Sequence, residues 1–387
     1  MRRVASTPRN HWEAMVEAAG LTWHSGEPAV KTLSTPPKSE AYWNESAFYE
    51  LTPREVDVLE SSTDELAGMT LRGAQHVIEN KLYSKMGIPE SAVPLIENSW
   101  EAEPPSLYGR FDLAYDGSSP PKLLEYNADT PTSLLEAAVV QWLWLQDLFP
   151  LRDQFNSIHE RLIARWRELR GYLPGEHIDF CSIDDVEDGM TVAYLLDTAR
   201  QAGLTATMFP IDEIGWDGVT FRGPDDRPLG AVFKLYPWEW MVREEFGAHL
   251  GKDHTIWIEP PWKMLLSNKG ILPILWELYP HHPNLLEARF DSAGQMTAWV
   301  RKPLLGREGA NTTLHGPGLH VETSGDYGAE GFVFQELASL GRFDDVHQIV
   351  GSWVVGHEEN ASCGIGVRES ESPIITNTSR FVPHLIG

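Results

Sequence analysis

The chain has 387 residues but little cysteine and no long apolar run. Its two cysteines, Cys181 and Cys363, exclude a disulfide framework and a thiolate metal site, and they favour a reducing compartment. No stretch approaches the roughly 20 apolar residues that span a bilayer. The basic start at Arg2 and Arg3 lacks the apolar core of a signal peptide. We therefore expect a cytoplasmic protein with no membrane partner.

Positive charge is also scarce. There are 31 Lys and Arg residues against 56 Asp and Glu, which gives a net charge of −25. Such a chain repels the phosphates of nucleic acid, so we expect no nucleic-acid partner. The charge suits a cationic small molecule such as a polyamine, but an acidic surface kept for solubility explains it equally well. No obligatory protein partner is implied.

Several catalytic signatures are missing. The sequence contains neither the Walker A pattern GxxxxGK[ST] nor a GxGxxG loop, which excludes the usual P-loop and dinucleotide-binding motifs. It also lacks the GxSxG elbow of serine hydrolases and the HExxH zinc motif. No side chain stands out as a nucleophile.

Apolar residues are plentiful, at 42% of the chain, with 15 Trp, 14 Phe and 11 Tyr. A chain of this length can bury a large core, and it suggests two or three lobes. Residues 10–100 are predicted to be mostly helical. The strongest signal there is Thr52-Pro53-Arg54-Glu55, in which Thr52 is an N-cap, Pro53 occupies the first helical position and Glu55 completes a capping box.

The rest of the chain is predicted to mix helices and strands. Residues 177–235 alternate between strand and helix patterns, which is typical of an α/β lobe. Residues 295–370 contain strands broken by Gly, as in an α+β lobe. Residues 134–148 are predicted to form a helix that is apolar almost all round and should be buried. The segment 28–39, rich in Ser and Pro, is predicted to be a surface excursion.

Two strand-like stretches carry the clearest functional signal. Side chains two apart on a strand share a face, so Arg110 lies with Asp112, and Glu125 with Asn127. The turn signal at 116–121 predicts a hairpin that sets Asp112 opposite Glu125 and Arg110 opposite Asn127. Facing carboxylates repel each other, and a hard divalent cation between them removes the conflict. The alternative is a solvated face on an ordinary hairpin.

A glycine-bearing loop offers a second candidate site. Lys302 is predicted to follow a strand at 297–300 and to precede a loop that contains Gly306, Arg307 and Gly309. Backbone N–H groups of such a loop can approach a phosphate closely, and the two cations add positive charge. A plain turn is the alternative interpretation.

Three further residues could serve an anionic ligand. Lys269 precedes a predicted buried helix at 271–279, where an anion would offset the unfavourable position of a cation at a helix start. Gln335 follows a predicted strand, where it could lie by an adenine edge. Arg368, on a Gly-flanked strand, could stabilise charge on a transferred phosphoryl group. The alternatives are a solvated lysine, an ordinary strand end and a surface salt bridge.

Taken in order, these motifs resemble the synthetase domain of the glutathionylspermidine synthase family, an ATP-grasp fold, and especially its single-domain acid–amine ligases. The resemblance covers the chain from about residue 10. It rests on Ser106–Asp112, Leu124–Thr130, Phe233–Glu239, Ser267–Lys269, Ile271–Trp276, Lys302–Pro303, Gly364–Arg368 and Ser379–His384.

The resemblance implies a fold and a reaction. The fold would be an α/β (α+β) ATP-grasp unit with mixed sheets over residues 1–387. It would comprise a mostly helical segment at 10–100, a lobe with the metal-site hairpin at 101–290, and a nucleotide-covering α+β lobe at 291–387. The reaction would be ATP-driven amide formation between a carboxylate and an amine. An acyl phosphate would form first, and ADP and phosphate would be released.

The resemblance also implies roles for the candidate residues. Asp112, Glu125 and Asn127 would hold two Mg²⁺ ions on the triphosphate. The ATP contacts would be Lys269, Lys302, Gly306, Arg307, Gly309 and Gln335. Arg110 and Arg368 would be catalytic, steadying the acyl phosphate. Thr130, Thr132 and Glu239 match positions that bind the acid substrate.

The sequence departs from the bifunctional synthases in two respects. No cysteine precedes Cys181, so we expect no cysteine amidase domain and no hydrolysis of the product. Thr130 and Thr132 stand where the synthases have smaller serines, so the acid substrate is either glutathione or another short peptide. Two rival functions remain: a kinase or ATPase that does not condense its substrates, and a regulatory protein with a degenerate nucleotide site.

Overall fold

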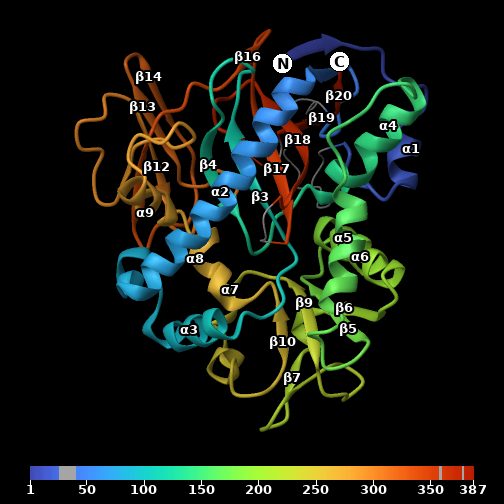
Figure 1. Ribbon diagram of the computed structural model, residues 1–387, viewed down its shortest axis with the longest axis vertical. Coiled ribbons are helices and arrows are strands. Elements are labelled where there is room, and N and C mark those ends of the chain that lie inside the picture. Colours follow the sequence, from blue (N-terminus) through green and yellow to red (C-terminus); the bar gives the residue numbers. More distant parts are fainter. Residues whose placement is uncertain (26–40, 357–359, 377–378) are drawn as a thin grey trace, which may run out of the picture.

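The predicted hairpin lies in the central sheet of the molecule. The computed structural model describes residues 1–25, 41–356, 360–376 and 379–387. The central sheet is antiparallel and runs in the order β19-β18-β17-β3-β4, with β16 paired to β17 (Figure 1). Its strands are β3 (Tyr108–Ala114), β4 (Lys122–Asn127), β16 (Arg342–Phe343), β17 (Val346–Val355), β18 (Ser362–Ser370) and β19 (Arg380–Val382).

A second antiparallel sheet lies beside the first, in the order β11-β15-β12-β13-β14 (Figure 1). Its strands are β11 (Ala288–Arg289), β12 (Trp299–Pro303), β13 (Thr313–Gly316), β14 (Leu319–Glu322) and β15 (Phe332–Glu336). Two predictions need correction here. Lys302 and Gln335 lie inside strands β12 and β15 rather than after them, because pairing between these two strands extends both beyond their alternating stretches.

A four-stranded parallel sheet confirms the α/β pattern of residues 177–235. Its order is β10-β9-β5-β6, seen at the bottom of Figure 1. The strands are β5 (His177–Ser182), β6 (Thr205–Pro210), β9 (Ala231–Leu235) and β10 (Ile256–Ile258). Helices α5 (Ile158–Leu169) and α6 (Val186–Gln201) pack against each other beside it. The short ribbon β7 (Gly215–Trp216) and β8 (Phe221–Arg222) extends this end.

The N-terminal part combines helices with a small sheet. Strands β1 (Arg2–Ala5), β2 (Ala47–Leu51) and β20 (His384–Ile386) bring the two ends of the chain together. Helices α1 (Trp12–Ala18), α2 (Pro53–Glu79) and α3 (Val93–Ala102) confirm the helical prediction, and the Thr52–Glu55 capping box is present. The segment predicted as a surface excursion, 28–39, lies outside the described residues.

The helix expected at 134–148 is not one regular α-helix. A π-helical turn (Glu136–Val140) leads into α4 (Gln141–Leu148). The prediction that this helix is buried holds for residues 134–141 but is wrong for the rest of α4, because Trp142 and Leu143 are 38% and 43% exposed. Trp144 and Leu145, on the opposite side, are fully buried. One face of the helix therefore packs inward while the other meets solvent.

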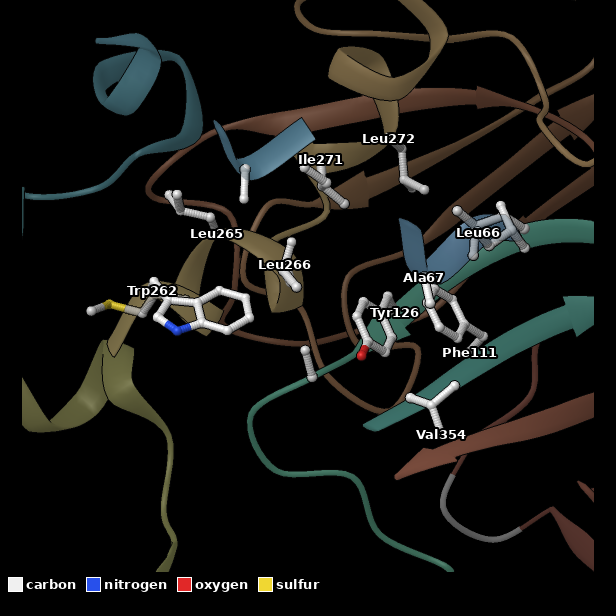
Figure 2. Packing of buried hydrophobic residues seen from close by; sticks show 14 of the residues in the cluster. Leu66, Ala67, Phe111, Tyr126, Trp262, Leu265, Leu266, Ile271, Leu272 and Val354 are labelled. Carbon is white, nitrogen blue, oxygen red and sulfur yellow. The ribbon is translucent and has the colours of Figure 1, made fainter. Parts of the chain in front are cut away.

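An apolar core fixes the hairpin from behind. Phe111 of β3 and Tyr126 of β4 stack with ring centroids 3.8 Å apart. Leu66 and Ala67 of α2 lie near these rings in Figure 2 and belong to the same core. Helices α8 (Met264–Ser267) and α9 (Ile271–Leu278) add Leu265, Leu266, Ile271 and Leu272 to it. No helix in the described ranges is long and apolar enough to cross a bilayer.

Candidate functional site

The predicted site residues meet in one cavity, which has walls on both antiparallel sheets. It holds about 1360 Å³ of empty space, its open mouth included. Every predicted residue except Glu239 lines it: Arg110, Asp112, Glu125, Asn127, Thr130, Thr132, Lys269, Lys302, Gly306, Arg307, Gly309, Gln335 and Arg368. Glu239, at the start of α7 (Trp238–Met241), lines an adjoining hollow that shares Thr130 and Arg307 with the cavity.

The predicted strand register is confirmed. Asp112 pairs with Glu125 and Arg110 pairs with Asn127 across β3 and β4. The connecting turn is held by Asp116, whose carboxylate accepts the backbone N–H groups of Ser118 and Ser119. The two carboxylates therefore face the same cavity, as the alternation of the sequence indicated.

Two arginines neutralise Asp112. Arg110 donates to the Asp112 carboxylate from Nε at 2.7 Å and from Nη2 at 3.1 Å. Arg368 donates to the same carboxylate from Nη2 at 2.7 Å. Arg110 also donates to the carbonyl oxygen of Thr132. Asp112 and Arg110 are only 3% and 5% exposed, so the pair is held in a low-dielectric setting.

Two lysines surround Glu125. Lys269 Nζ lies 3.0 Å from the Glu125 carboxylate and donates to Gly306 O at 2.6 Å. Burial acts to raise the pKa of Glu125, but Lys269 and Lys302 overcome that effect and hold the pKa well below its usual range. Burial, together with repulsion from Lys269, lowers the pKa of Lys302 to about 8. Glu125 is therefore a carboxylate at neutral pH.

The donor set of the hairpin fits a hard cation. Asp112, Glu125 and Asn127 offer two carboxylates and an amide, which are oxygen ligands of the kind that Mg²⁺ prefers. The described ranges contain no cluster of three or more His, Cys, Asp or Glu side chains suited to a metal. The predicted set is not such a cluster, because it has only two carboxylates and its third member is an amide.

The loop after β12 is fastened across the cavity. Arg307 donates to Glu239 Oε1 at 3.0 Å and to Thr130 Oγ1 at 2.9 Å. The loop turns at Gly309, whose φ is +70° and whose added Cβ would lie 2.8 Å from Ile374 Cγ2. The loop thus bridges the predicted acid-binding residues and the predicted nucleotide-binding residues.

An acidic end of the cavity was missed by the sequence analysis. Tyr42 and Glu187 line it, and the Tyr42 hydroxyl donates to Glu136 Oε1 at 2.8 Å. Glu136 is fully buried, and its Oε2 has no hydrogen-bond partner among the residues that the structure describes. Burial, followed by repulsion from Glu136, raises the pKa of Glu187 to about 8. Burial and the nearby Asp185 likewise raise the pKa of Asp188 to about 6.

One signal could have drawn attention to this end. Asp185, Glu187 and Asp188 lie at the start of α6, just after the end of strand β5, at the edge of a parallel sheet where ligands commonly bind. Gly351 was also missed. It pairs with Asp112 from β17, and a Cβ there would lie 2.9 Å from Arg110 Cδ. Nothing in the local sequence marks this glycine as making room for the arginine.

Comparisons with known proteins agree with this geometry. The family model described as "Glutathionylspermidine synthase preATP-grasp" matches residues 3–387. A Haemophilus influenzae protein, provisionally named an acid–amine ligase, is 43% identical over 89% of this chain and 90% of its own length. The trypanothione synthetase of Crithidia fasciculata is 30% identical over 80% of this chain and 51% of its own length.

Two further matches define the extent of the likeness. The bifunctional glutathionylspermidine synthetase/amidase of Escherichia coli is 28% identical over 88% of this chain. The match covers 59% of that longer enzyme. Among solved structures, a glutathione synthetase-like effector from Globodera pallida superposes with a TM-score of 0.55 at 9% identity, over 88% of this chain and 89% of that one. This likeness concerns the fold alone.

Proposed function

We propose, from the premise that this chain belongs to the glutathionylspermidine synthase family, that it joins a peptide carboxylate to an amine through an acyl phosphate. The chain is an ATP-dependent carbon–nitrogen ligase with an ATP-grasp type of fold. The proposal concerns its substrates, its intermediate and the roles of its residues. It is carried by one observation: one end of a single cavity holds two lysines and two arginines around the carboxylates of Asp112 and Glu125, and the same cavity is also lined by Glu187.

The cationic end suits the triphosphate of ATP. Lys269 approaches from the turn before α9 and Lys302 from β12, and residues 306–310 of the loop after β12 line the same cavity. Asp112, Glu125 and Asn127 would hold Mg²⁺ ions, up to two, which when bound neutralise the β- and γ-phosphates. Phosphoryl transfer requires such neutralisation, since its negative charge spreads over several oxygens.

The two arginines suit the transferred group. The substrate carboxylate would attack the γ-phosphorus, the bond to the β-phosphate oxygen would break, and ADP would leave. Arg110 and Arg368 would then orient and stabilise the acyl phosphate by charge-assisted hydrogen bonds. Both already reach the same carboxylate, Asp112, so their guanidinium groups converge on one small region.

The adjoining residues suit the two organic substrates. Thr130, Thr132 and Glu239 border the cationic end and would position the acid, with Arg307 held between Thr130 and Glu239. Glu187 and the nearby Asp188 would pair with the amine as a cation, whose charge would favour the ionised forms of these carboxyl groups, and this is consistent with a polyamine. The attacking nitrogen would first give up its ammonium proton to water; it would then attack the acyl carbon, the C–O bond to phosphate would break, and phosphate would leave while the nitrogen passes a second proton to the phosphate or to water.

A phosphate-release screen tests this function. Glutathione, other short peptides and amino acids would each be combined with spermidine, putrescine or a simple amine, in the presence of ATP and Mg²⁺. The proposal predicts ADP and phosphate only when both substrates are present, together with a condensed product in the mass spectrum. Release of AMP and diphosphate would refute the acyl-phosphate route, and turnover without condensation would favour a kinase or ATPase.

A single substitution tests the role given to Glu125. Glu125→Ala removes a carboxylate from the proposed metal site, so we expect ATP turnover to fall by about 10²–10³-fold or more. The circular dichroism spectrum should remain that of the wild type. Glu322→Ala, at an exposed position on β14, serves as the control and should retain full turnover. Unchanged ATP hydrolysis by the Glu125 variant would remove this residue from the site.

A further inference from the structure

Gln335 links the two sheets that form the cavity walls. It lies on β15, and its side chain is only 1% exposed. Its Nε2 donates to the carbonyl oxygen of Leu123 on β4 at 2.8 Å, and its Oε1 accepts from Lys302 Nζ at 2.8 Å. Both hydrogen bonds run to residues that flank or face the proposed nucleotide site. The amide is therefore already engaged by protein groups.

The strand register explains the contact with Lys302. Lys302 of β12 pairs with Val333 of β15, and Gln335 lies two residues further along the same strand. Lys302 and Gln335 are thus diagonal neighbours on one face of the sheet, within reach of long side chains. The Lys302 ammonium also donates to Leu124 O at 2.9 Å. Two of its three N–H groups are fixed, which leaves one for a ligand.

We propose that Gln335 is a positioning residue, which holds the Lys302 ammonium in place for the nucleotide phosphates. This inference rests on the proposed function and differs from the sequence-based expectation that Gln335 lies by the adenine. The Leu123 carbonyl can only accept, so it turns the amide until Nε2 faces β4 and Oε1 faces Lys302. The lysine is then oriented by β4, the strand that carries Glu125 and Asn127.

The neutral amide matters chemically. A carboxylate at this position would pair with Lys302 and compensate its charge, so less would remain for a phosphate. With no acceptor on the side chain of residue 335, only the Leu124 carbonyl would hold the ammonium, and the flexible lysine stem could swing toward Glu125 and occupy a carboxylate that the proposed site needs. An amide oxygen avoids both outcomes, because it fixes the ammonium without neutralising it.

Nucleotide binding without turnover provides the test. The proposal predicts that Gln335→Met weakens the binding of Mg-ADP, measured by calorimetry, by about tenfold, the usual scale for a hydrogen bond to a charged group. Gln335→Glu should weaken it at least as much. The KM for the acid and for the amine should change less than twofold. Gln348→Met is the matched control, since Gln348 is also a buried strand glutamine whose Nε2 donates to a carbonyl oxygen, that of Tyr115.

A double-mutant cycle separates positioning from simple destabilisation. If Gln335 acts through Lys302, Gln335→Met should cause no further loss of ADP affinity in a protein that already carries Lys302→Met. Additive losses would overturn the proposal, as would equal losses in the Gln335→Met and Gln348→Met variants. If the wild-type protein itself bound no ADP, the proposed function would fail. If the wild type and Gln335→Met bound ADP equally well, only the positioning role of Gln335 would fail.

Discussion

Arg110 makes two parallel hydrogen bonds to Asp112, and this arrangement gives a prediction for a single residue. A lysine keeps the charge but cannot reproduce the two-pronged contact. Arg110→Lys should therefore lower kcat by about 10²–10³-fold, measured as ADP release, while the protein remains folded. The control is Arg222→Lys on β8. This partly exposed arginine pairs with Asp217 and is not among the residues that line the cavity. Equal activity of both variants would contradict the role given to Arg110.

Glu187 gives a second prediction at the residue scale, on the dependence of stability on pH. Its pKa is raised from 4.5 to about 8 in the folded protein, chiefly by burial. Between these values the unfolded chain has lost a proton that the folded protein keeps, so the free energy of unfolding falls as the pH rises. Glu187→Gln removes this loss. The variant should gain stability relative to wild type as the pH is raised from about 5 to about 8.

Urea unfolding without substrate at the two pH values measures the effect. Glu60→Gln, at a side chain of α2 that is exposed to solvent, is the control and should show no such pH-dependent gain. A constant difference between Glu187→Gln and wild type at both pH values would mean that burial does not perturb this carboxylate.

At the scale of elements, strand β17 must pass close to the arginine of β3. A Cβ on Gly351 would lie 2.9 Å from Arg110 Cδ, closer than normal side-chain contacts allow. Gly351→Ala should displace Arg110 from Asp112, lower kcat and cost about 1–3 kcal/mol of stability. Gly215→Ala on β7 is the control, since no atom of the described part of the chain lies within 4 Å of its added Cβ. Wild-type kcat in the Gly351 variant would show that Arg110 tolerates the methyl group.

The elements differ in how far the sequence could predict them. The β3–β4 register follows from local alternation around one turn, so Asp112 and Glu125 could be paired in advance. The limits of β12 and β15 could not be predicted. Lys302 and Gln335 belong to these strands because the two strands pair with each other, and the two residues lie far apart in the sequence. Local pattern decides the hairpin, and tertiary pairing decides the second wall.

The acidic end shows the same limit more strongly. Tyr42, Glu136 and Glu187 belong to a loop, a π-helical turn and helix α6, and only packing brings them together. The exposed face of α4 was unpredictable for a related reason: its apolar residues encircle the helix, so composition could not reveal which side meets solvent. Groups from separate elements require the folded structure to be placed.

At the scale of the whole molecule, a net charge of −25 should influence how charged substrates arrive. If the amine is a polyamine, its attraction to the protein will weaken as salt screens the charges. The KM for spermidine should therefore rise as ionic strength increases from about 50 to about 500 mM. A simple monoamine, with less charge, should show a smaller rise. Equal salt dependence for both amines would indicate that the net charge has no role in substrate capture.

The most direct test of the account is a crystal structure with Mg²⁺ and the non-hydrolysable ATP analogue AMP-PNP. We predict the triphosphate between Lys269 and Lys302, with metal bound by Asp112, Glu125 and Asn127. An empty cavity, or a nucleotide bound elsewhere while these oxygens remain without metal, would contradict it.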